Sequence, residues 1–223
     1  MDIKTEQHPV IKDLLWRRTA KKYDVSKKIS KENLDIIYES LRLSASSINS
    51  QPWKFIVLDS LEAKQRMYNT FISDKCKFNQ AHILESSQLI MFAHNPSYTR
   101  TDHAKVVDKS ILDGRLKQED REKGFNAFVF AELNTDENGY NGNWTKAQLY
   151  IALGNLLHTL ARLRIDATPI EGIDVENVNK EFAKELEGYQ CDVLLAIGYS
   201  HAEDVNKKLP KSRLSKESII KII

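Results

Sequence analysis

The sequence predicts a fold that combines α-helices with a small β-sheet, and the evidence is three apolar runs and the helical patterns between them. The runs cover residues 55–58, 89–93 and 193–197, and each has the length and composition of a buried strand. Between the runs, apolar residues recur every three or four positions, as they do in amphipathic helices. No low-complexity linker or internal repeat divides the chain, so we expect one domain over residues 1–223.

The composition is that of an ordinary soluble globular protein and excludes several classes of partner. The net charge of +2 leaves no overall field that would attract nucleic acid or a membrane. No apolar run approaches the length of a membrane span, and the polar residues 1–6 are unlike a secretory signal. Cys76 and Cys191 lie far apart in the sequence and form no metal-type or redox-type pair. We therefore expect a cytoplasmic protein without a metal, a nucleic acid or a membrane as partner.

The helices expected in the first half of the chain begin at residues suited to that position. Pro9 fits the first turn of a helix that runs to Arg17, and Ser30 fits the N-cap of a second helix. Asp59 is expected to cap the helix that follows the first strand, and a short helix is expected over residues 81–86. The apolar stripe of the second helix consists of Leu34, Ile37 and Leu41.

The second half of the chain contains the strongest helical pattern. Residues 95–142 are charged and weakly periodic, and we expect a helical excursion there with its apolar residues inward: Val106, Val107, Ile111 and Leu112. The helix that begins near Trp144 and ends near Leu163 is apolar on most sides, so it should be enclosed by its own core or by a partner subunit. An amphipathic helix is expected over residues 175–186. The apolar tail, residues 219–223, should pack on something.

A polar loop over residues 46–53 has more hydrogen-bonding groups than a connecting turn needs. Pro52 is expected to hold Gln51 in an extended conformation, which would leave the loop's side chains free to bind a flat, polar ligand. The alternative is a Ser/Asn-rich turn whose side chains satisfy their own backbone.

Two basic clusters, residues 17–23 and 209–214, suit the binding of a phosphate group, because guanidinium and ammonium groups neutralise and donate to phosphate oxygens. The alternative for the first cluster is a solvated basic surface at a helix end. In the segment 169–172, Gly172 allows either a positive φ or the close approach of a ligand, and a simple turn is the default.

Several common catalytic and binding motifs are absent. The chain has no GxGxxG after a strand, no P-loop, no HExxH, no Cys/His ligand spacing and no GxSxG elbow. The basic clusters are too small, and too poor in interleaved aromatic residues, for a nucleic-acid surface.

Five short segments, taken in order, resemble the FMN-dependent nitroreductase family, specifically its oxygen-insensitive NAD(P)H nitroreductase and dihydropteridine reductase branch. The segments are residues 17–24 (RRTAKKYD), 46–53 (SSINSQPW), 78–79 (FN), 169–172 (PIEG) and 209–214 (LPKSRL). The resemblance covers nearly the whole chain. It implies an α+β fold with a central, mainly antiparallel sheet flanked by helices, in an intertwined homodimer with two FMN sites at the interface.

The resemblance also implies which residues bind the cofactor. The FMN phosphate, ribityl chain and pyrimidine edge would be held by Arg17, Arg18, Thr19, Lys21, Lys211 and Arg213. The flavin ring would be bonded by Asn79 and lined by Pro169, Ile170, Glu171 and Gly172, with the Glu171 backbone amide close to N5. Ser46, Ser47 and Asn49 would come from the other subunit, and residues 215–223 would form an arm on it. Lys21 and Glu171 are expected to tune the flavin, and no catalytic side chain is required.

The implied function is an FMN-dependent oxidoreductase that passes two electrons by ping-pong hydride transfer from NADH or NADPH to nitroaromatic or quinone acceptors. The alternatives are a dedicated dihydropteridine or quinone reductase with incidental nitro activity, a flavin-binding protein without turnover, and an anion-binding domain without flavin. The chain departs from the branch at two positions. His82 stands where the branch usually has lysine, and Cys76 stands where an aromatic residue is common near the substrate pocket.

Overall fold

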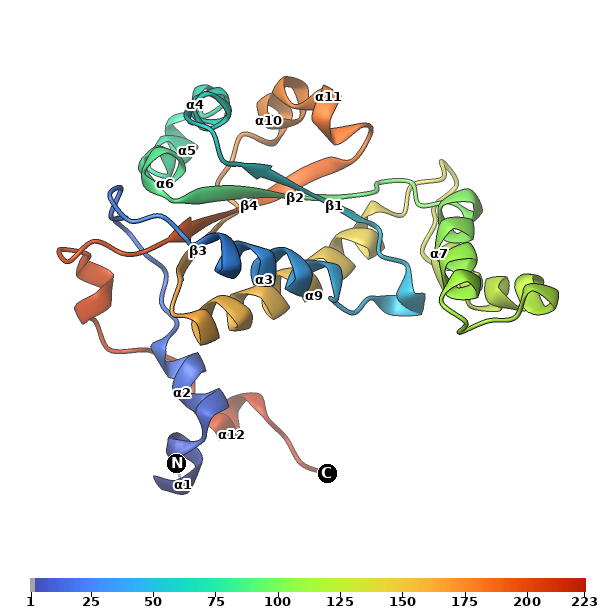
Figure 1. Cartoon of the computed structure of the whole chain (residues 1–223), viewed down its shortest axis with the longest axis horizontal. Coiled ribbons are helices and arrows are strands. Elements are labelled where there is room, and N and C mark those ends of the chain that lie inside the picture. Colours follow the sequence, from blue (N-terminus) through green and yellow to red (C-terminus); the bar gives the residue numbers. More distant parts are fainter. Residues whose placement is uncertain (1–2) are drawn as a thin grey trace.

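The computed structural model describes residues 3–223, and a four-stranded antiparallel sheet forms its centre (Figure 1). Residues 1 and 2, which the expected domain includes, lie outside the described residues. The strand order is β1 (Trp53–Leu58), β2 (Gln88–His94), β4 (Gln190–Gly198), β3 (Asp166–Ile170), and each neighbouring pair is antiparallel. The expectation of an α+β fold with an antiparallel sheet is confirmed.

Helices cover both faces of the sheet (Figure 1). One face carries α3 (Lys31–Arg42) and α9 (Gly142–Leu163). The other carries α4 (Leu61–Asn69), α5 (Asp74–Lys77), α6 (Gln80–Glu85), α10 (Val175–Glu181) and α11 (Ala183–Leu186). Because side chains alternate along a strand, β2 sends Ile90 and Phe92 into the core under α3 and α9, and Leu89 and Met91 into the opposite core.

Helix caps follow from short polar side chains. The expected cap of α3 is confirmed, since the Ser30 side chain accepts a hydrogen bond from the Asn33 backbone amide. The expected cap of α4 is wrong. Ser60 fills that position and accepts from the Ala63 amide, while the Asp59 carboxylate accepts a hydrogen bond from the Gln88 side chain.

The excursion consists of α7 (Arg100–Leu112), η2 (Gln118–Phe128) and α8 (Val129–Glu132), which lie beyond the end of the sheet (Figure 1). Val107 is buried there as expected, but Leu112 is 81% exposed. Leu112 is the last residue of α7, and the helix ends in solvent there. The inside of the excursion is a small cluster that includes Tyr98 and Phe128.

The helix expected over residues 175–186 is broken in two. Phe182 separates α10 from α11 with a non-helical backbone conformation (φ −103°, ψ 20°). The break accompanies complete burial of the Phe182 ring, with the Arg66 guanidinium 4.5 Å from the ring centre.

Both ends of the chain project from the body on the same side (Figure 1). They comprise α1 (Ile3–Gln7), α2 (Pro9–Trp16) and α12 (Lys216–Ile219), whereas η3 (Val205–Lys208) lies at the sheet edge, where the Asn206 side chain donates to the Thr19 carbonyl. The apolar tail does not pack within its own chain, because Ile219, Ile220 and Ile222 are exposed. The long helix α9 is also open on one side, where Ile151 is 48% exposed. Neither apolar surface is enclosed by the single chain. None of the helices over residues 3–223 has the combination of length and apolar character needed to cross a membrane.

Mutation can test the burial of Phe92 and the exposure of Leu112. Phe92 is fully buried in β2 and packs edge-to-face on Phe55, so Phe92→Ala should lower the free energy of unfolding by about 3–5 kcal/mol. Leu112→Ala should change it by no more than about 0.5 kcal/mol, because the side chain is exposed. Urea denaturation measures both values. A large loss of unfolding free energy in Leu112→Ala would instead support the inward orientation that the sequence pattern predicts.

Candidate functional site

The first basic segment lies along the outer edge of β3. Thr19 pairs with Ala167 in a parallel bridge, which extends the sheet beyond its last strand. The Asp204 carboxylate accepts hydrogen bonds from the backbone amides of Lys21 (2.5 Å) and Lys22 (2.9 Å). The backbone of this segment is therefore held by the sheet and by one buried carboxylate, while the Lys22 side chain pairs with Glu203 at 2.6 Å.

The second basic segment folds back onto the first. The Lys211 ammonium group donates to the Arg17 carbonyl, and the Arg18 guanidinium donates to the Leu209 carbonyl. Burial lowers the pKa of Arg17, and the nearby charge of Arg213 lowers it further. The pKa of Lys211 is lowered by burial and then by the charges of Arg17, Arg213 and Arg18. Positive charges from the two ends of the chain thus repel one another at close range.

Five basic side chains of these two segments take no part in an ion pair among the described residues. They are Arg17, Arg18, Lys21, Lys211 and Arg213. We call these five residues the cation cluster. Like charges held together without ion-pair partners favour the binding of an anion, since a phosphate group relieves the repulsion and accepts charge-assisted hydrogen bonds.

Asn79 and Gly172, which are far apart in sequence, meet beside the end of β3. The nearly buried Asn79 side chain donates from its amide nitrogen to the Gly172 carbonyl oxygen at 2.9 Å. The positive φ considered for Gly172 is wrong, because Gly172 is not among the glycines with positive φ. Glycine suits the position for another reason: a Cβ atom would lie 2.8 Å from the Asn79 amide nitrogen and would displace that side chain.

His82 connects this pair to the cation cluster. It follows Asn79 by three residues on α6 and packs edge-to-face on Tyr23, with ring centres 6.3 Å apart. Burial lowers the pKa of His82, and the positive charge of Lys21 lowers it further. His82 is therefore neutral at neutral pH and adds no positive charge to the site. Cys76 is buried in the apolar core between the sheet and the helices on the α6 side.

Glu171 is exposed directly after β3, and a residue that the sequence did not single out holds its side chain. The Tyr150 hydroxyl on α9 donates to the Glu171 carboxylate. Burial raises the pKa of Tyr150, and the adjacent carboxylate raises it further. Tyr150 was missed because the helical pattern identifies it only as one more large residue on an apolar helix.

The loop with Ser46, Ser47 and Asn49 is not brought to the other segments within one chain. The Ser47 amide donates to the Gln148 side chain on α9 at 2.8 Å. Gln148 and Tyr150 project from opposite flanks of α9, because successive helical residues are about 100° apart. The loop therefore lies across α9 from Glu171. The four remaining segments are gathered at the edge of β3.

The conformation expected for Gln51 is wrong, since its φ is 45°. Its amide donates to the Ser46 hydroxyl at 3.0 Å, and its side chain donates to the Asn49 carbonyl and amide oxygens. These local bonds outweigh the preference imposed by Pro52. Ile48 and Asn49 are also left-handed, and this conformation is unusual for a β-branched residue such as Ile48. Packing of Ile48 against the cluster of Tyr98 and Phe128 holds the loop.

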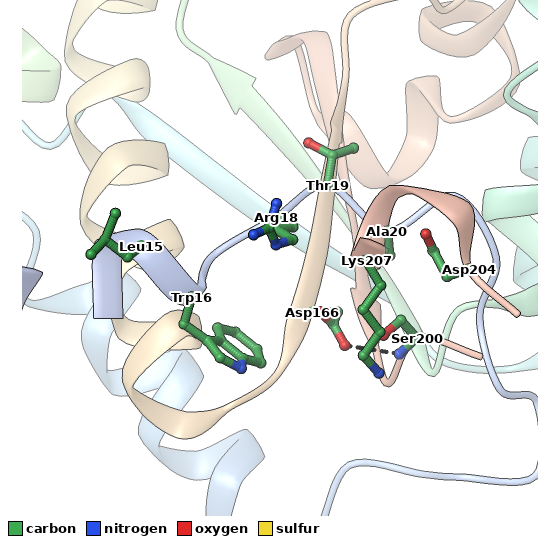
Figure 2. A pocket seen from close by; sticks show the side chains of 9 residues that line it. All are labelled: Leu15, Trp16, Arg18, Thr19, Ala20, Asp166, Ser200, Asp204 and Lys207. Atoms are coloured by element: carbon green, nitrogen blue, oxygen red, sulfur yellow. Dashed lines mark hydrogen bonds between the residues drawn. The ribbon is translucent and has the colours of Figure 1, made fainter. Parts of the chain in front are cut away.

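A cavity of about 240 Å³ adjoins the cation cluster (Figure 2). Arg18 and Thr19 form part of its wall, and Trp16 closes one side. The remaining lining residues are Leu15, Ala20, Asp166, Ser200, Asp204 and Lys207.

Comparisons with known proteins agree with this geometry. Residues 14–199 match the model of the nitroreductase family. The chain is 56% identical over 217 residues to the major NAD(P)H-flavin oxidoreductase of Aliivibrio fischeri, an alignment that covers 97% of this chain and 99% of that protein. It is 33% identical over 215 residues to the oxygen-insensitive NAD(P)H nitroreductase of Salmonella typhimurium, with 95% and 98% covered.

Solved structures share the fold. The chain superposes with a TM-score of 0.80 on an Exiguobacterium sibiricum protein described as a nitroreductase in complex with FMN, at 25% identity and with 97% and 98% of the two chains covered. The resemblance of the five segments is therefore confirmed at the level of the family. The chain belongs to the nitroreductase family.

Proposed function

We propose that this protein is an FMN-dependent oxidoreductase that passes two electrons from NADH or NADPH to nitroaromatic or quinone acceptors. The observation that carries the proposal is the cation cluster, which lies without carboxylate partners at the edge of β3, beside Asn79 and Gly172. The names of the relatives from Aliivibrio fischeri and Salmonella typhimurium, and the FMN complex of the Exiguobacterium sibiricum structure, support this reading.

The residues present fit FMN. Its phosphate carries close to two negative charges at neutral pH and matches the unbalanced charge of Arg17, Lys211 and Arg213, with the Thr19 hydroxyl as a further donor. Lys21 would face the pyrimidine edge of the flavin. The ring would be lined by Asn79 and by Pro169, Ile170, Glu171 and Gly172.

When bound, FMN supplies hydride acceptance and two-electron transfer, and the protein supplies orientation and electrostatics. The Lys21 ammonium group would stabilise negative charge at the pyrimidine edge. The Glu171 backbone amide would donate to the ring, while Tyr150 holds the Glu171 side chain against α9. The sequence contains no separate dinucleotide-binding motif, so donor and acceptor would occupy one open face in turn, which corresponds to ping-pong transfer.

We also propose a homodimer. Ser46, Ser47 and Asn49 lie across α9 from Glu171 in one chain, so they would reach the flavin of the partner subunit. The half-exposed side of α9 around Ile151 and the exposed tail offer apolar surface for such an interface. Residues 215–223 would form the arm on the partner.

The first experiment is the absorbance spectrum of the purified protein, followed by anaerobic addition of NADH or NADPH. A flavin spectrum that bleaches with the donor and returns with a nitroaromatic or a quinone supports the proposal. A flavin that no donor reduces would indicate a binding protein without turnover. Values of kcat/KM across nitroaromatics, quinones and dihydropteridines then separate a general reductase from a dedicated one.

Arg213→Gln should have opposite effects on cofactor binding and on stability. Loss of one charge-assisted hydrogen bond should weaken FMN binding about tenfold. The FMN-free protein should unfold at the same or a higher temperature, because the variant relieves repulsion on Arg17 and Lys211. Fluorescence titration and thermal denaturation measure the two quantities. Lys216→Gln on α12 is the control, and equal FMN affinity in both variants would remove Arg213 from the site.

The stability of the FMN-free protein should fall as the pH decreases below about 6.5, and His82 should contribute to that fall. The pKa of His82 is lowered in the folded state, so the unfolded chain binds its proton first. Stability from this residue is complete above the unfolded pKa and is lost as the pH falls toward the folded one. His103, whose pKa burial also lowers, contributes in the same direction. His82→Gln should therefore reduce the slope in urea denaturation between pH 7 and 5, and an unchanged slope would contradict the assignment.

Ile151→Glu should convert the dimer into monomers, because it introduces a charge on the open side of α9. Sedimentation velocity measures the oligomeric state. Glu176→Gln, on α10 at the opposite face of the sheet, also changes the net charge by one unit and should leave the sedimentation coefficient unaltered. A dimer that tolerates Ile151→Glu would place the interface elsewhere.

A further inference from the structure

The cavity in Figure 2 contains a hydrogen-bonding group that nothing in the protein uses. Ser200 is 7% exposed, and its hydroxyl oxygen has no hydrogen-bond partner in the part of the chain that the structure describes. A buried hydroxyl without a partner is costly, since it loses its bonds to water and gains none in return. The oxygen is also closed to solvent, so a ligand in the cavity would supply the missing partner once a side chain of the wall moves aside.

Two basic side chains of the cavity are also available. Arg18 donates only to the Leu209 carbonyl, and neither Arg18 nor Lys207 forms an ion pair among residues 3–223. Figure 2 shows both side chains among those that line the cavity. Together with the Ser200 hydroxyl they provide donors for an anionic group.

The two carboxylates that line the cavity are already engaged. Asp204 accepts from the backbone amides of Lys21, Lys22 and Asn206. Asp166 accepts from the Ser200 amide at 2.9 Å. These carboxylates keep their charge, but their oxygens are occupied by backbone amides, and neither forms an ion pair with Arg18 or Lys207.

The local charge exceeds what one phosphate group can balance. Residues 17–22 and 207–213 contain eight basic residues, and three carboxylates stand beside them: Glu203, which is paired with Lys22, and Asp166 and Asp204 at the cavity. An FMN phosphate contributes at most about two negative charges, so positive charge remains for a second phosphate nearby. Trp16 offers an aromatic surface at the wall of the same cavity.

We propose that this cavity binds the adenosine end of NADPH, with its 2′-phosphate on Arg18, Lys207 and Ser200. The proposal rests on the proposed function and deepens it, because it assigns the donor. Asp166 lies at the cavity and Glu171 at the ring end of the site, five residues apart along an extended strand, or about 16 Å. An extended dinucleotide is of comparable length. In this proposal Arg18 binds the 2′-phosphate of NADPH and not the phosphate of FMN, which the family resemblance implies for it.

The test compares NADPH with NADH on the FMN-loaded protein, by anaerobic stopped-flow reduction at fixed ionic strength. Arg18→Gln with Lys207→Gln should raise the apparent Kd for NADPH at least tenfold. Once absorbance shows equal FMN content in the variant and the unmodified protein, the Kd for NADH should stay within about twofold. Lys208→Gln removes the same charge one residue beyond the cavity lining and is the matched control. Arg18→Lys should restore part of the discrimination, because it keeps the charge and loses the guanidinium geometry.

Ser200→Ala gives a second test that is independent of charge. The hydroxyl makes no hydrogen bond in the protein alone, so the variant should not lower the melting temperature. It should still weaken NADPH binding and inhibition by adenosine 2′,5′-bisphosphate, while inhibition by 5′-AMP stays the same.

The outcomes separate the two proposals. Equal losses for NADPH and NADH, or no loss in any variant, would overturn the donor site while a reducible flavin leaves the proposed function standing. Inorganic phosphate could also inhibit reduction by NADPH and by NADH to the same extent, and the double variant could abolish both inhibitions. That result would indicate a site for free phosphate and would overturn the donor assignment. Failure to bind FMN would instead refute the proposed function.

Discussion

The pairing of residues 17–22 with the outer edge of β3 is the constraint on which the candidate site depends. The parallel bridge between Thr19 and Ala167 places the segment, and the Asp204 carboxylate fixes its backbone. Residues 209–213 fold onto this segment through two hydrogen bonds: the Arg17 carbonyl accepts from Lys211, and the Arg18 guanidinium donates to the Leu209 carbonyl. Without this pairing, the basic residues from the two ends of the chain would have no reason to remain together against their mutual repulsion.

Much of the fold could be predicted because its signals are local. The run in β2 is apolar on both faces, and the structure buries every residue of that strand. The Ser30 cap acts within three residues of itself. Leu112 was predicted wrongly because a helical pattern does not show where the packing partner ends. Phe182 breaks a continuous pattern, and no residue there is a helix breaker such as proline or glycine.

The site could be predicted only in part, since its supports act between distant residues. Asp204 binds amides more than 180 residues away, and Tyr150 meets Glu171 through the packing of α9 on β3. Neither contact has a sequence signal of its own. The conformation of Gln51 was predicted wrongly for a local reason. Three hydrogen bonds within its own loop outweigh the influence of the neighbouring proline. The roles of the individual residues toward FMN stay predictions.

The cation cluster has a consequence for the life of the protein in a cell. A group of like charges without ion-pair partners lowers the stability of the empty protein, and a tightly bound anion restores it by an amount that rises with the logarithm of its free concentration. Newly made chains would therefore be open to proteases for as long as the cofactor is scarce, and protected once it is supplied. On the proposed function, the abundance of this protein would follow the supply of flavin without any dedicated regulator.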